Sequence, residues 1–199
     1  MEVDAMDKAG NVKERIIEVT TELIEQYNGN AKSITARMIA EKAGVGLGLI
    51  NYHFRSKENL ITECVQRIIK KVVTEFRMTE CYNTDKERLT ACAICVFDFL
   101  FEHPAISRIS MLGDLQNYTA TCNSVFTQRG FSSNMMHDVS NADRPILAFI
   151  LTAAMQTAFL GSEAMKQLLG YDFTRSEDRA TYIRKLVDIF FEGVSQIDE

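Results

Sequence analysis

Apolar positions recur at helical spacing along nearly the whole chain. In the first predicted helix, residues 11–27, one apolar stripe forms because Val12, Ile16, Val19 and Leu23 stand three or four positions apart. No run of alternating apolar and polar residues lies between turn signals, and such runs are typical of strands. The sequence therefore predicts an all-α protein.

Capping residues set the bounds of the other predicted helices. Thr35 and Ser56 stand where N-cap residues are preferred. Pro104 and Pro145 fit the first turn of a helix, where the missing N–H costs nothing. In chain order, the predicted helices are residues 36–43, 47–53, 57–78, 86–102, 104–112, 115–129, 144–169 and 176–194.

The most specific pattern in the chain is a pair of short helices joined by a glycine-containing turn. Gly44 stands between the predicted helices 36–43 and 47–53 and permits the positive φ that turns the chain. The small side chain of Ala40 lets the second helix approach closely. The residues expected on the inner face are Ile39, Ala43, Val45 and Ile50. This pattern indicates a helix-turn-helix.

Composition and charge change this picture in one place. The chain has 199 residues, 46% of them hydrophobic, and a formal net charge of −5, which suits a folded domain and does not itself indicate nucleic-acid binding. Between residues 31 and 57, however, five cations stand against Glu41 alone, a local charge of five minus one, +4. The cations are Lys32, Arg37, Lys42, Arg55 and Lys57. Contacts to DNA phosphates need such a patch.

This segment resembles the DNA-binding domain of the TetR family of repressors over about residues 10–60. The shared motifs are Ile34-Thr35, Ile39-Ala40, Ala43-Gly44-Val45, Tyr52-His53-Phe54 and Ser56-Lys57-Glu58-Asn59-Leu60. The resemblance implies a three-helix DNA-binding domain over residues 1–56 and a helical ligand-binding and dimerisation domain over residues 57–199. It also implies a function, which is a repressor released from operator DNA by a small molecule.

The resemblance implies roles for the matching positions. Thr35 would bind a phosphate at the start of its helix, where the helix dipole favours an anion. Arg37 would contact a phosphate or a base edge. Tyr52, His53 and Lys57 would contact phosphates. The residues expected to face the major groove are Gly46, Leu47, Gly48 and Asn51.

This chain differs from many relatives of that family in its recognition helix. Gly46 stands where Ser or Thr is common, and Asn51 stands where Tyr is common. An Asn side chain can pair with an adenine edge, and Leu47 can rest on a thymine methyl group, but the operator does not follow from this. Each candidate also has a plainer interpretation, in which exposed charges such as Arg37 are merely solvated. Core packing is the expected role of Phe54 and the alternative for Tyr52.

The C-terminal part is expected to sense a small molecule in a pocket between helices. Candidate lining residues are polar or polarisable groups on apolar helical faces, with simple core packing as the alternative for each. They are Cys95, Phe99, Met111, Gln116, Tyr118, Phe126, Met155, Gln156 and Phe159.

The last two predicted helices are candidates for a homodimer interface. Small and apolar residues such as Ile146, Phe149 and Ala153 lie on the first of them, and Ile189 lies on the second. The resemblance implies a four-helix contact across a two-fold axis, and packing within one chain is the alternative. Two recognition helices would then read half-sites about 34–36 Å apart.

Other functional classes receive less support. Five cysteines, an odd number, and a polar stretch over residues 1–10 with no apolar core argue against a secreted disulfide framework and favour reduced thiols in the cytoplasm. The uncharged stretch 146–162 is too short for a typical membrane span.

A cysteine-based redox or metal sensor is the alternative function, since Cys92, Cys95 and His103 can share one helical face. The main interpretation needs no metal or cofactor. Catalysis is not expected, because the sequence has no nucleophile elbow, phosphate loop or HExxH motif. An activator or a regulator without a ligand remains open.

Overall fold

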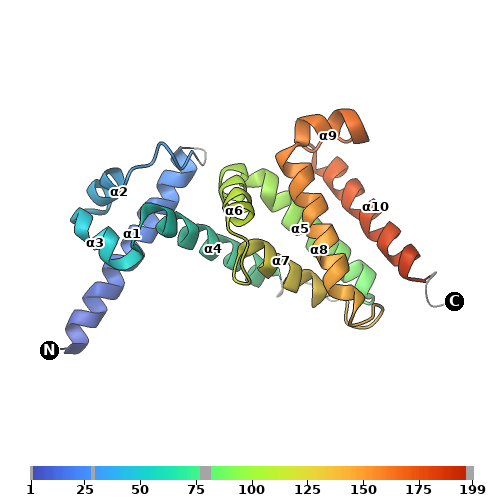
Figure 1. Ribbon diagram of the computed structural model, residues 1–199, viewed down its shortest axis with the longest axis horizontal. Coiled ribbons are helices and arrows are strands. Elements are labelled where there is room, and N and C mark those ends of the chain that lie inside the picture. Colours follow the sequence, from blue (N-terminus) through green and yellow to red (C-terminus); the bar gives the residue numbers. More distant parts are fainter. Residues whose placement is uncertain (1, 28–29, 77–81, 196–199) are drawn as a thin grey trace. The chain divides into compact units, whose positions relative to one another are not determined.

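The computed structural model describes residues 2–27, 30–76 and 82–195, and every regular element in these ranges is a helix (Figure 1). The helices are α1 (Glu2–Gln26), α2 (Ala36–Ala43), α3 (Leu47–Phe54), α4 (Lys57–Phe76), α5 (Asp85–Glu102), α6 (Pro104–Gln116), α7 (Asn123–Ser132), α8 (Asp143–Leu160), α9 (Ser162–Leu169) and α10 (Ser176–Ser195). The predicted all-α class is confirmed. Residues 77 and 78 of the expected fourth helix lie outside the described residues.

Within these ranges, no helix taken singly has both the length and the apolar character needed to cross a membrane. The pairs α5–α6 and α8–α9 meet those criteria only when each pair is counted together.

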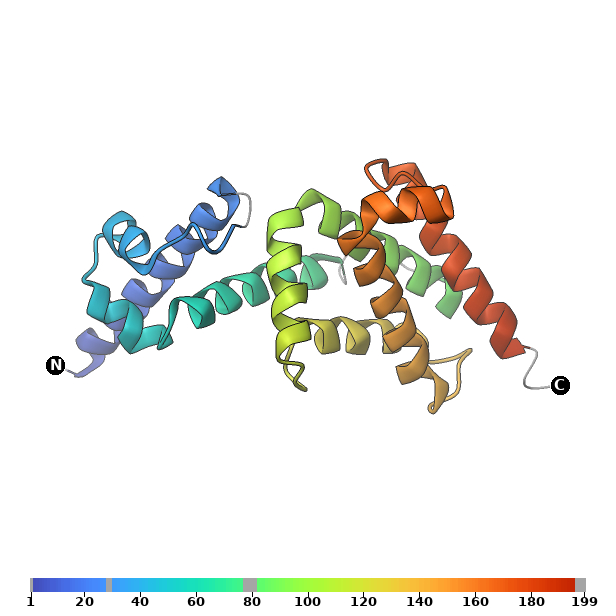
Figure 2. The ribbon, with the colours of Figure 1, turned by 45° about the horizontal axis from the view of Figure 1, so that its top comes forward.

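Four predicted helices are wrong in their bounds. The first begins at Glu2 and not at residue 11, and α6 ends at Gln116 and not at residue 112. The predicted helix 115–129 does not exist, because α6 continues to Gln116 and α7 begins only at Asn123. The Asp114 carboxylate accepts the backbone N–H of Ser124 at 2.7 Å, which satisfies a donor that a new helix start leaves free. The predicted helix 144–169 is two helices, α8 and α9, which turn by 104° around Gly161 (Figure 2).

The helices form two compact units. The first unit consists of Met1–Lys71 and Pro104–Gly113, so it contains α1 to α3, most of α4 and most of α6. Its centre is apolar, and α2 and α3 pack there with α1 (Figure 2). Residues that are at most 2% exposed in this core are Ile16, Ile24, Ile34, Ile39, Ile50, Leu60, Cys64, Val65 and Ile106. The domain boundary expected after residue 56 stays a prediction, although compactness groups the first part of α4 with α1 to α3.

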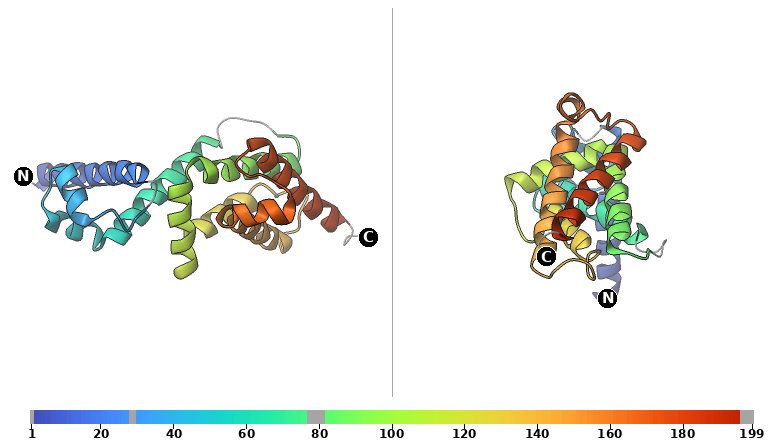
Figure 3. Two further views of the ribbon diagram at one scale, coloured as in Figure 1. Left: turned by 90° about the horizontal axis from the view of Figure 1, so that it is seen from above. Right: turned by 90° about the vertical axis from the view of Figure 1, so that its right-hand side faces the viewer.

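The second unit consists of Val72–His103 and Asp114–Glu199. Within it, α5 lies beside α10 and α7 lies beside α8 (Figure 3). Aromatic rings from α5, α10 and the α9–α10 connection meet edge to face at its centre. The ring of Phe97 lies 5.3 Å from Phe173, and Phe173 lies 5.0 Å from Tyr182, between ring centroids. Such aromatic pairs stabilise the packing of α5 on α10 by more than the burial of their apolar surface alone.

An ion pair between buried Arg179 and half-buried Asp98 also joins α5 to α10. Arg179 is 7% exposed, and its Nε donates to the Asp98 carboxylate at 2.5 Å. One terminal nitrogen of the same guanidinium donates to the carbonyl oxygens of Phe173 and Thr174, at 3.0 and 3.2 Å. The guanidinium carbon lies 5.3 Å from the centroid of the Phe101 ring. The charge is thus paired and hydrogen-bonded, as a buried charge must be.

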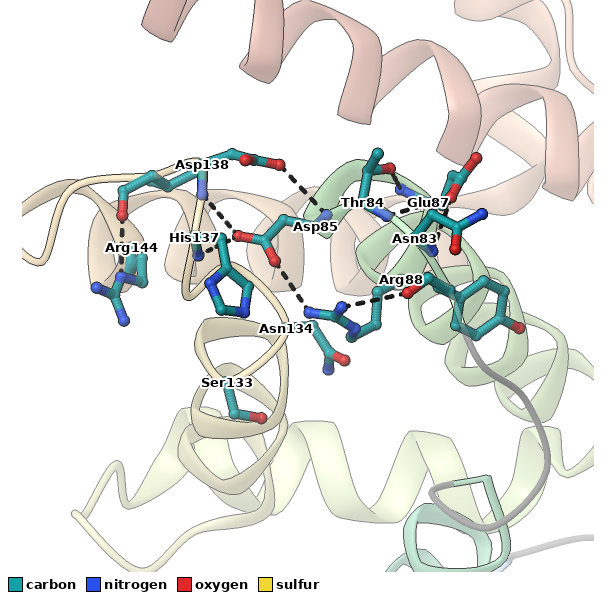
Figure 4. A network of polar contacts seen from close by, with 12 residues as sticks. Asn83, Thr84, Asp85, Glu87, Arg88, Ser133, Asn134, His137, Asp138 and Arg144 are labelled. Atoms are coloured by element: carbon teal, nitrogen blue, oxygen red, sulfur yellow. Dashed lines mark hydrogen bonds and ion pairs between the residues drawn. The ribbon is translucent and has the colours of Figure 1, made fainter.

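A buried carboxylate, that of Asp85, ties the start of α5 to the segment between α7 and α8 (Figure 4). Asp85 is 1% exposed and accepts the backbone N–H groups of His137 and Asp138. Arg88 donates to its other oxygen at 2.9 Å. Burial acts to raise the pKa of Asp85, but the backbone N–H groups of Asp138 and His137 outweigh it and hold the pKa below the usual value.

Candidate nucleic-acid interface

Local backbone chemistry explains the bend between α2 and α3. Thr35 is the N-cap of α2, and its side chain accepts the Met38 N–H at 3.2 Å. Gly44 ends the helix in the left-handed conformation, with φ +63° and ψ +38°. The Val45 N–H then donates to the Ala40 carbonyl at 2.9 Å, and α3 begins at Leu47. The predicted helix-turn-helix bend therefore exists.

The two faces of this small motif differ in chemistry. Ile39 and Ile50 are 0% exposed, Ala43 is 3% exposed, and Val45 packs against the same core from a half-buried position. Phe54 is 4% exposed, which confirms its expected role in the core. The opposite surface of α2 and α3 is left free to meet a partner.

Seven of the nine predicted DNA contacts are exposed. Tyr52 is 78% exposed, so the core-packing alternative for it is wrong. The other exposed residues are Thr35, Arg37, Gly46, Leu47, Gly48 and Asn51, while His53 and Lys57 are half-buried. The exposed positions come from the start of α2 and from α3. They offer hydroxyl, guanidinium, amide and apolar groups within one continuous stretch of structure.

The cations of this surface make weak or partial ion pairs. Arg37 lies 3.8 Å from the Glu41 carboxylate, with 86% of its side chain exposed. Lys42 pairs with Glu22 at 3.1 Å, and Lys57 donates to the Ala31 carbonyl at 2.9 Å. An exposed pair contributes little to stability, so Arg37 can exchange Glu41 for a phosphate at small cost.

Arg55 has an unusual backbone that the sequence did not indicate. It is the C-cap of α3, with φ +66° and ψ −40°, and it is the one residue other than glycine with a positive φ among the described residues. Its side chain is exposed. A residue with a Cβ is strained in this conformation, and such strain tends to occur at functional sites. The exposed side chain of Arg55 places a cation at the junction of α3 and α4.

A charge network holds α4 against α1. Arg67 on α4 donates to both carboxylate oxygens of Glu14 on α1 and lies 3.3 Å from Glu63. Lys13 lies 2.8 Å from the same Glu63. Glu63 and Arg67 stand four positions apart, a spacing that was visible in the sequence, whereas their partners on α1 were not. The network sets the position of α4 relative to the helix-turn-helix.

The nine candidate effector contacts fall into three groups. Phe99, Met111, Met155 and Phe159 are buried, Cys95 and Gln156 are half-buried, and Gln116, Tyr118 and Phe126 are exposed. Met111 belongs to the first compact unit and the other eight belong to the second. Their role as ligand contacts stays a prediction.

A polar chain crosses the apolar interior of the second unit near Gln156. Its Nε2 donates to the Ser124 hydroxyl at 2.7 Å, and that hydroxyl lies 2.6 Å from the Asp114 carboxylate. Asp114 and Ser124 are 9% and 3% exposed. The sequence pointed to Gln156 but not to its partner Ser124 or to Asp114, which accepts from Ser124, since nothing local marks them.

Comparison with known proteins agrees with this geometry. Residues 16–64 match the model of the tetR family of bacterial regulatory proteins. No curated protein matches the sequence of the chain.

Several solved structures share the fold. A TetR transcriptional regulator from Rhodococcus sp. RHA1 is 15% identical with a TM-score of 0.62, over 92% of this chain and 95% of that one. A TetR protein from Streptomyces coelicolor is 18% identical with a TM-score of 0.61, over 93% and 94% of the two chains. A transcriptional regulator from Aquifex aeolicus VF5 is 21% identical with a TM-score of 0.53, over 90% and 99%. At these identities the likeness shows the fold.

Proposed function

We propose that this chain, whose residues 16–64 match the tetR family of bacterial regulatory proteins, is a DNA-binding transcriptional regulator that acts as a homodimeric repressor and is released from its operator by a small molecule. The observation that carries the proposal is the bend at Gly44, which sets the exposed groups of α3 beside the capped start of α2. In this proposal the chain is a regulator and not an enzyme, it needs no cofactor, and it acts in the cytoplasm.

The surface of α2 and α3 suits a DNA backbone in its chemistry. Thr35 and the free N–H groups at the start of α2 can receive one phosphate, and Arg37 can reach the same strand. Tyr52 and His53 follow on α3, with ring centroids 5.0 Å apart, and Lys57 begins α4. We infer that these five residues contact phosphates, and that Gly46, Leu47, Gly48 and Asn51 enter the major groove.

The effector is proposed to act through α4. The boundary between the two compact units falls inside this helix, after Lys71, and Lys57 stands at its other end. A ligand that prefers a different arrangement of the second unit would therefore move the helix that begins at the DNA surface. Release requires the ligand to bind the DNA-incompetent state more tightly, by about 1–3 kcal/mol of coupling.

Exposed apolar residues on α8 and α10 support a homodimer. Ile146, Phe149 and Ile150 on α8 are 56%, 54% and 42% exposed, and Ile189 on α10 is 52% exposed. Their spacing on α8 forms a stripe along one side of the helix. Solvent exposure of such a stripe is unfavourable, and a second copy would cover it. The two recognition helices of the dimer would then bind half-sites about one helical turn apart.

DNA binding is tested by selecting duplexes from a random pool with the full chain and measuring affinity at several salt concentrations. We expect a palindromic site, and we expect Arg37→Ala to weaken binding and to reduce the salt slope by about one. Arg175→Ala is the matched control, since Arg175 is also exposed and paired with a nearby glutamate, but lies in the second unit. Failure to enrich any duplex, or equal effects of the two variants, would refute the proposal.

The release step is tested separately with the selected duplex. A panel of small molecules is screened for binding by thermal shift, and each binder is then added to the protein–DNA complex. We expect at least one binder to dissociate the complex, and a Gln156→Leu variant to lose that response while keeping DNA affinity. If every molecule that binds leaves DNA affinity unchanged, release by an effector is refuted.

A thiol sensor receives no support from two of the cysteines. Burial raises the pKa of the Cys64 thiol to about 11, and burial also raises the pKa of Cys95 above its usual value. Both thiols are therefore protonated near neutral pH, and a protonated thiol is a poor nucleophile and metal ligand. Among the described residues, no three His, Cys, Asp or Glu side chains are grouped to hold a metal ion. Cys81 lies outside the described residues.

A further inference from the structure

Two glycines stand at the start of α3, and Gly48 has no explanation within the folded chain. Gly48 lies inside the helix and Gly46 is its N-cap, where Ser, Thr, Asp or Asn would add a stabilising bond. A Cβ atom added at either position meets no heavy atom within 4 Å, and Gly46 has an ordinary φ of −71°. Gly44 differs, because its φ of +63° itself favours glycine.

Glycine inside a helix weakens that helix, and the close approach of a ligand to the backbone is one reason for a glycine to occur there. Gly113, Gly130 and Gly193 also lie inside helices with open space around them, but Gly48 lies on the helix that is proposed to face DNA. Gly48 lies on the exposed side of α3, opposite the buried residues Ile50 and Phe54. The absence of side-chain atoms at positions 46 and 48 thus leaves an open backbone surface beside Leu47.

The side chains around this surface have no cationic group. Leu47 is 49% exposed, and Asn51 is exposed one helical turn further along the same side of α3. The helix Leu47–Phe54 contains neither Lys nor Arg. These are the residues that usually read guanine, through a bidentate contact to its O6 and N7 atoms.

We propose that α3 reads A·T base pairs at close range in each half-site. Leu47 packs on the 5-methyl groups of thymine, Asn51 pairs with the N6 and N7 atoms of adenine, and the backbone at Gly46 and Gly48 lies against the base edges between them. This proposal rests on the proposed operator binding and specifies the bases that face α3.

Thymine methyl groups in the selected duplex provide the direct test. Each thymine is replaced in turn by deoxyuridine, which lacks only the 5-methyl group, and affinity is measured with the full chain. We expect about a fourfold loss at one or two positions of each half-site, the value for one buried methyl group. The Leu47→Ala variant is expected to bind more weakly and to lose this sensitivity to uracil.

Leu49→Ala is the matched control for Leu47→Ala. Leu49 is a 39% exposed leucine on the same helix. Because it stands two positions after Leu47, its side chain points to a different side of the helix. The control variant is expected to keep the full sensitivity to uracil. Loss of that sensitivity in the Leu49→Ala variant as well, or G·C pairs enriched by selection at the positions that face α3, would overturn the proposal.

The backbone approach is tested by Gly48→Ala. Because the added methyl group meets no protein atom, we expect the variant to fold with a thermal midpoint unchanged or raised by about 2 °C. Its affinity for the selected duplex is expected to fall by about tenfold or more, since the methyl group occupies space that the bases need. Unchanged affinity would overturn the close approach.

The outcomes separate this inference from the function on which it rests. A chain that enriches a palindromic duplex but tolerates uracil and Gly48→Ala is an operator-binding protein that reads its site in another way. A chain that enriches no duplex refutes the proposed function, and this inference falls with it.

Discussion

The ammonium group of Lys57, at the start of α4, donates a hydrogen bond of 2.9 Å to the backbone carbonyl of Ala31, before α2. The Lys57 side chain is 22% exposed and also lies 3.7 Å from Glu58. An ammonium has three N–H donors, so the bond to Ala31 leaves others for a phosphate. Lys57 therefore joins two segments at the edge of the proposed DNA surface while keeping donors for DNA.

Lys57→Met separates these two roles. We expect the free energy of unfolding to fall by about 1 kcal/mol, from the lost bond to Ala31. If Lys57 also binds a phosphate, the slope of log affinity against log salt becomes shallower by about 0.9. Urea unfolding and salt-dependent binding measure the two effects. An unchanged slope would show that Lys57 contacts no phosphate and that its role is the hydrogen bond to Ala31.

Backbone strain at Arg55 predicts that a glycine variant is more stable than an alanine variant, the reverse of the usual order. Arg55→Ala removes the guanidinium and keeps the Cβ atom, whereas Arg55→Gly also relaxes the backbone at φ +66°. We expect the glycine variant to be more stable than the alanine variant by about 1 kcal/mol in urea unfolding. Both are expected to lose DNA affinity equally. Equal stabilities would show that the backbone there is not strained.

Stability is expected to fall at alkaline pH through Cys64. This thiol is 0% exposed, and burial raises its pKa from 9.0 to about 11. Between these two values the folded state keeps a proton that the unfolded state has lost, so stability falls as pH rises through this window. Urea unfolding at pH 8 and at pH 10.5 measures the fall. Cys64→Ala should show a smaller fall, and an identical one would contradict the assignment.

The Asp85 carboxylate is expected to be a large contributor to the stability of the second unit. Asp85→Asn replaces an acceptor of two backbone N–H groups and an Arg88 contact by a neutral amide, and we expect a loss of about 2 kcal/mol. Because its folded-state pKa lies below 3.8, this contribution is complete above pH 3.8 and is lost as pH falls through the lower folded value.

Urea unfolding of both proteins across acid pH measures this contribution. The exposed Asp138 provides the control, since its carboxylate accepts one N–H, that of Asp85, at 3.3 Å. Asp138→Asn should cost much less than Asp85→Asn. Equal losses would mean that the buried Asp85 contributes no more to the free energy of unfolding than the exposed Asp138.

The proposed dimer predicts a specific effect of charge on α8. Phe149→Glu buries a carboxylate in the interface if α8 pairs with its mate, so we expect sedimentation to show monomers and operator affinity to fall by about tenfold or more. Leu168→Glu changes a 73% exposed leucine on α9 in the same way and serves as the control. A dimer that survives Phe149→Glu would exclude α8 as its centre.

Local sequence signals were sufficient for the helix-turn-helix. Thr35 and Gly44 act on the few residues beside them, through a cap and a left-handed turn, and both functions were predictable from residue type. The inward position of Ile39, Ile50 and Phe54 followed from helical periodicity.

Long-range polar pairs were not predictable in this way. Arg179 meets Asp98 across 81 positions, and Asp85 meets His137 across 52. Neither spacing repeats a helical period, so no local pattern marks these pairs. The exposed positions of Gln116, Tyr118 and Phe126 have a related cause. They were expected to face inward on one helix over residues 115–129. In the structure α6 ends at Gln116 and α7 begins at Asn123, where Asp114 accepts the Ser124 N–H, so the three residues do not share one helix.

The pairing of Asp98 with Arg179 has a consequence for the history of the chain. Loss of Asp98 leaves the buried Arg179 guanidinium without its ion-pair partner, which is more harmful than loss of both residues. Related sequences are therefore expected to carry both residues or an apolar pair, and seldom an intermediate. The two positions should therefore covary across homologues, because a change at one of them is tolerated mainly when the other changes as well.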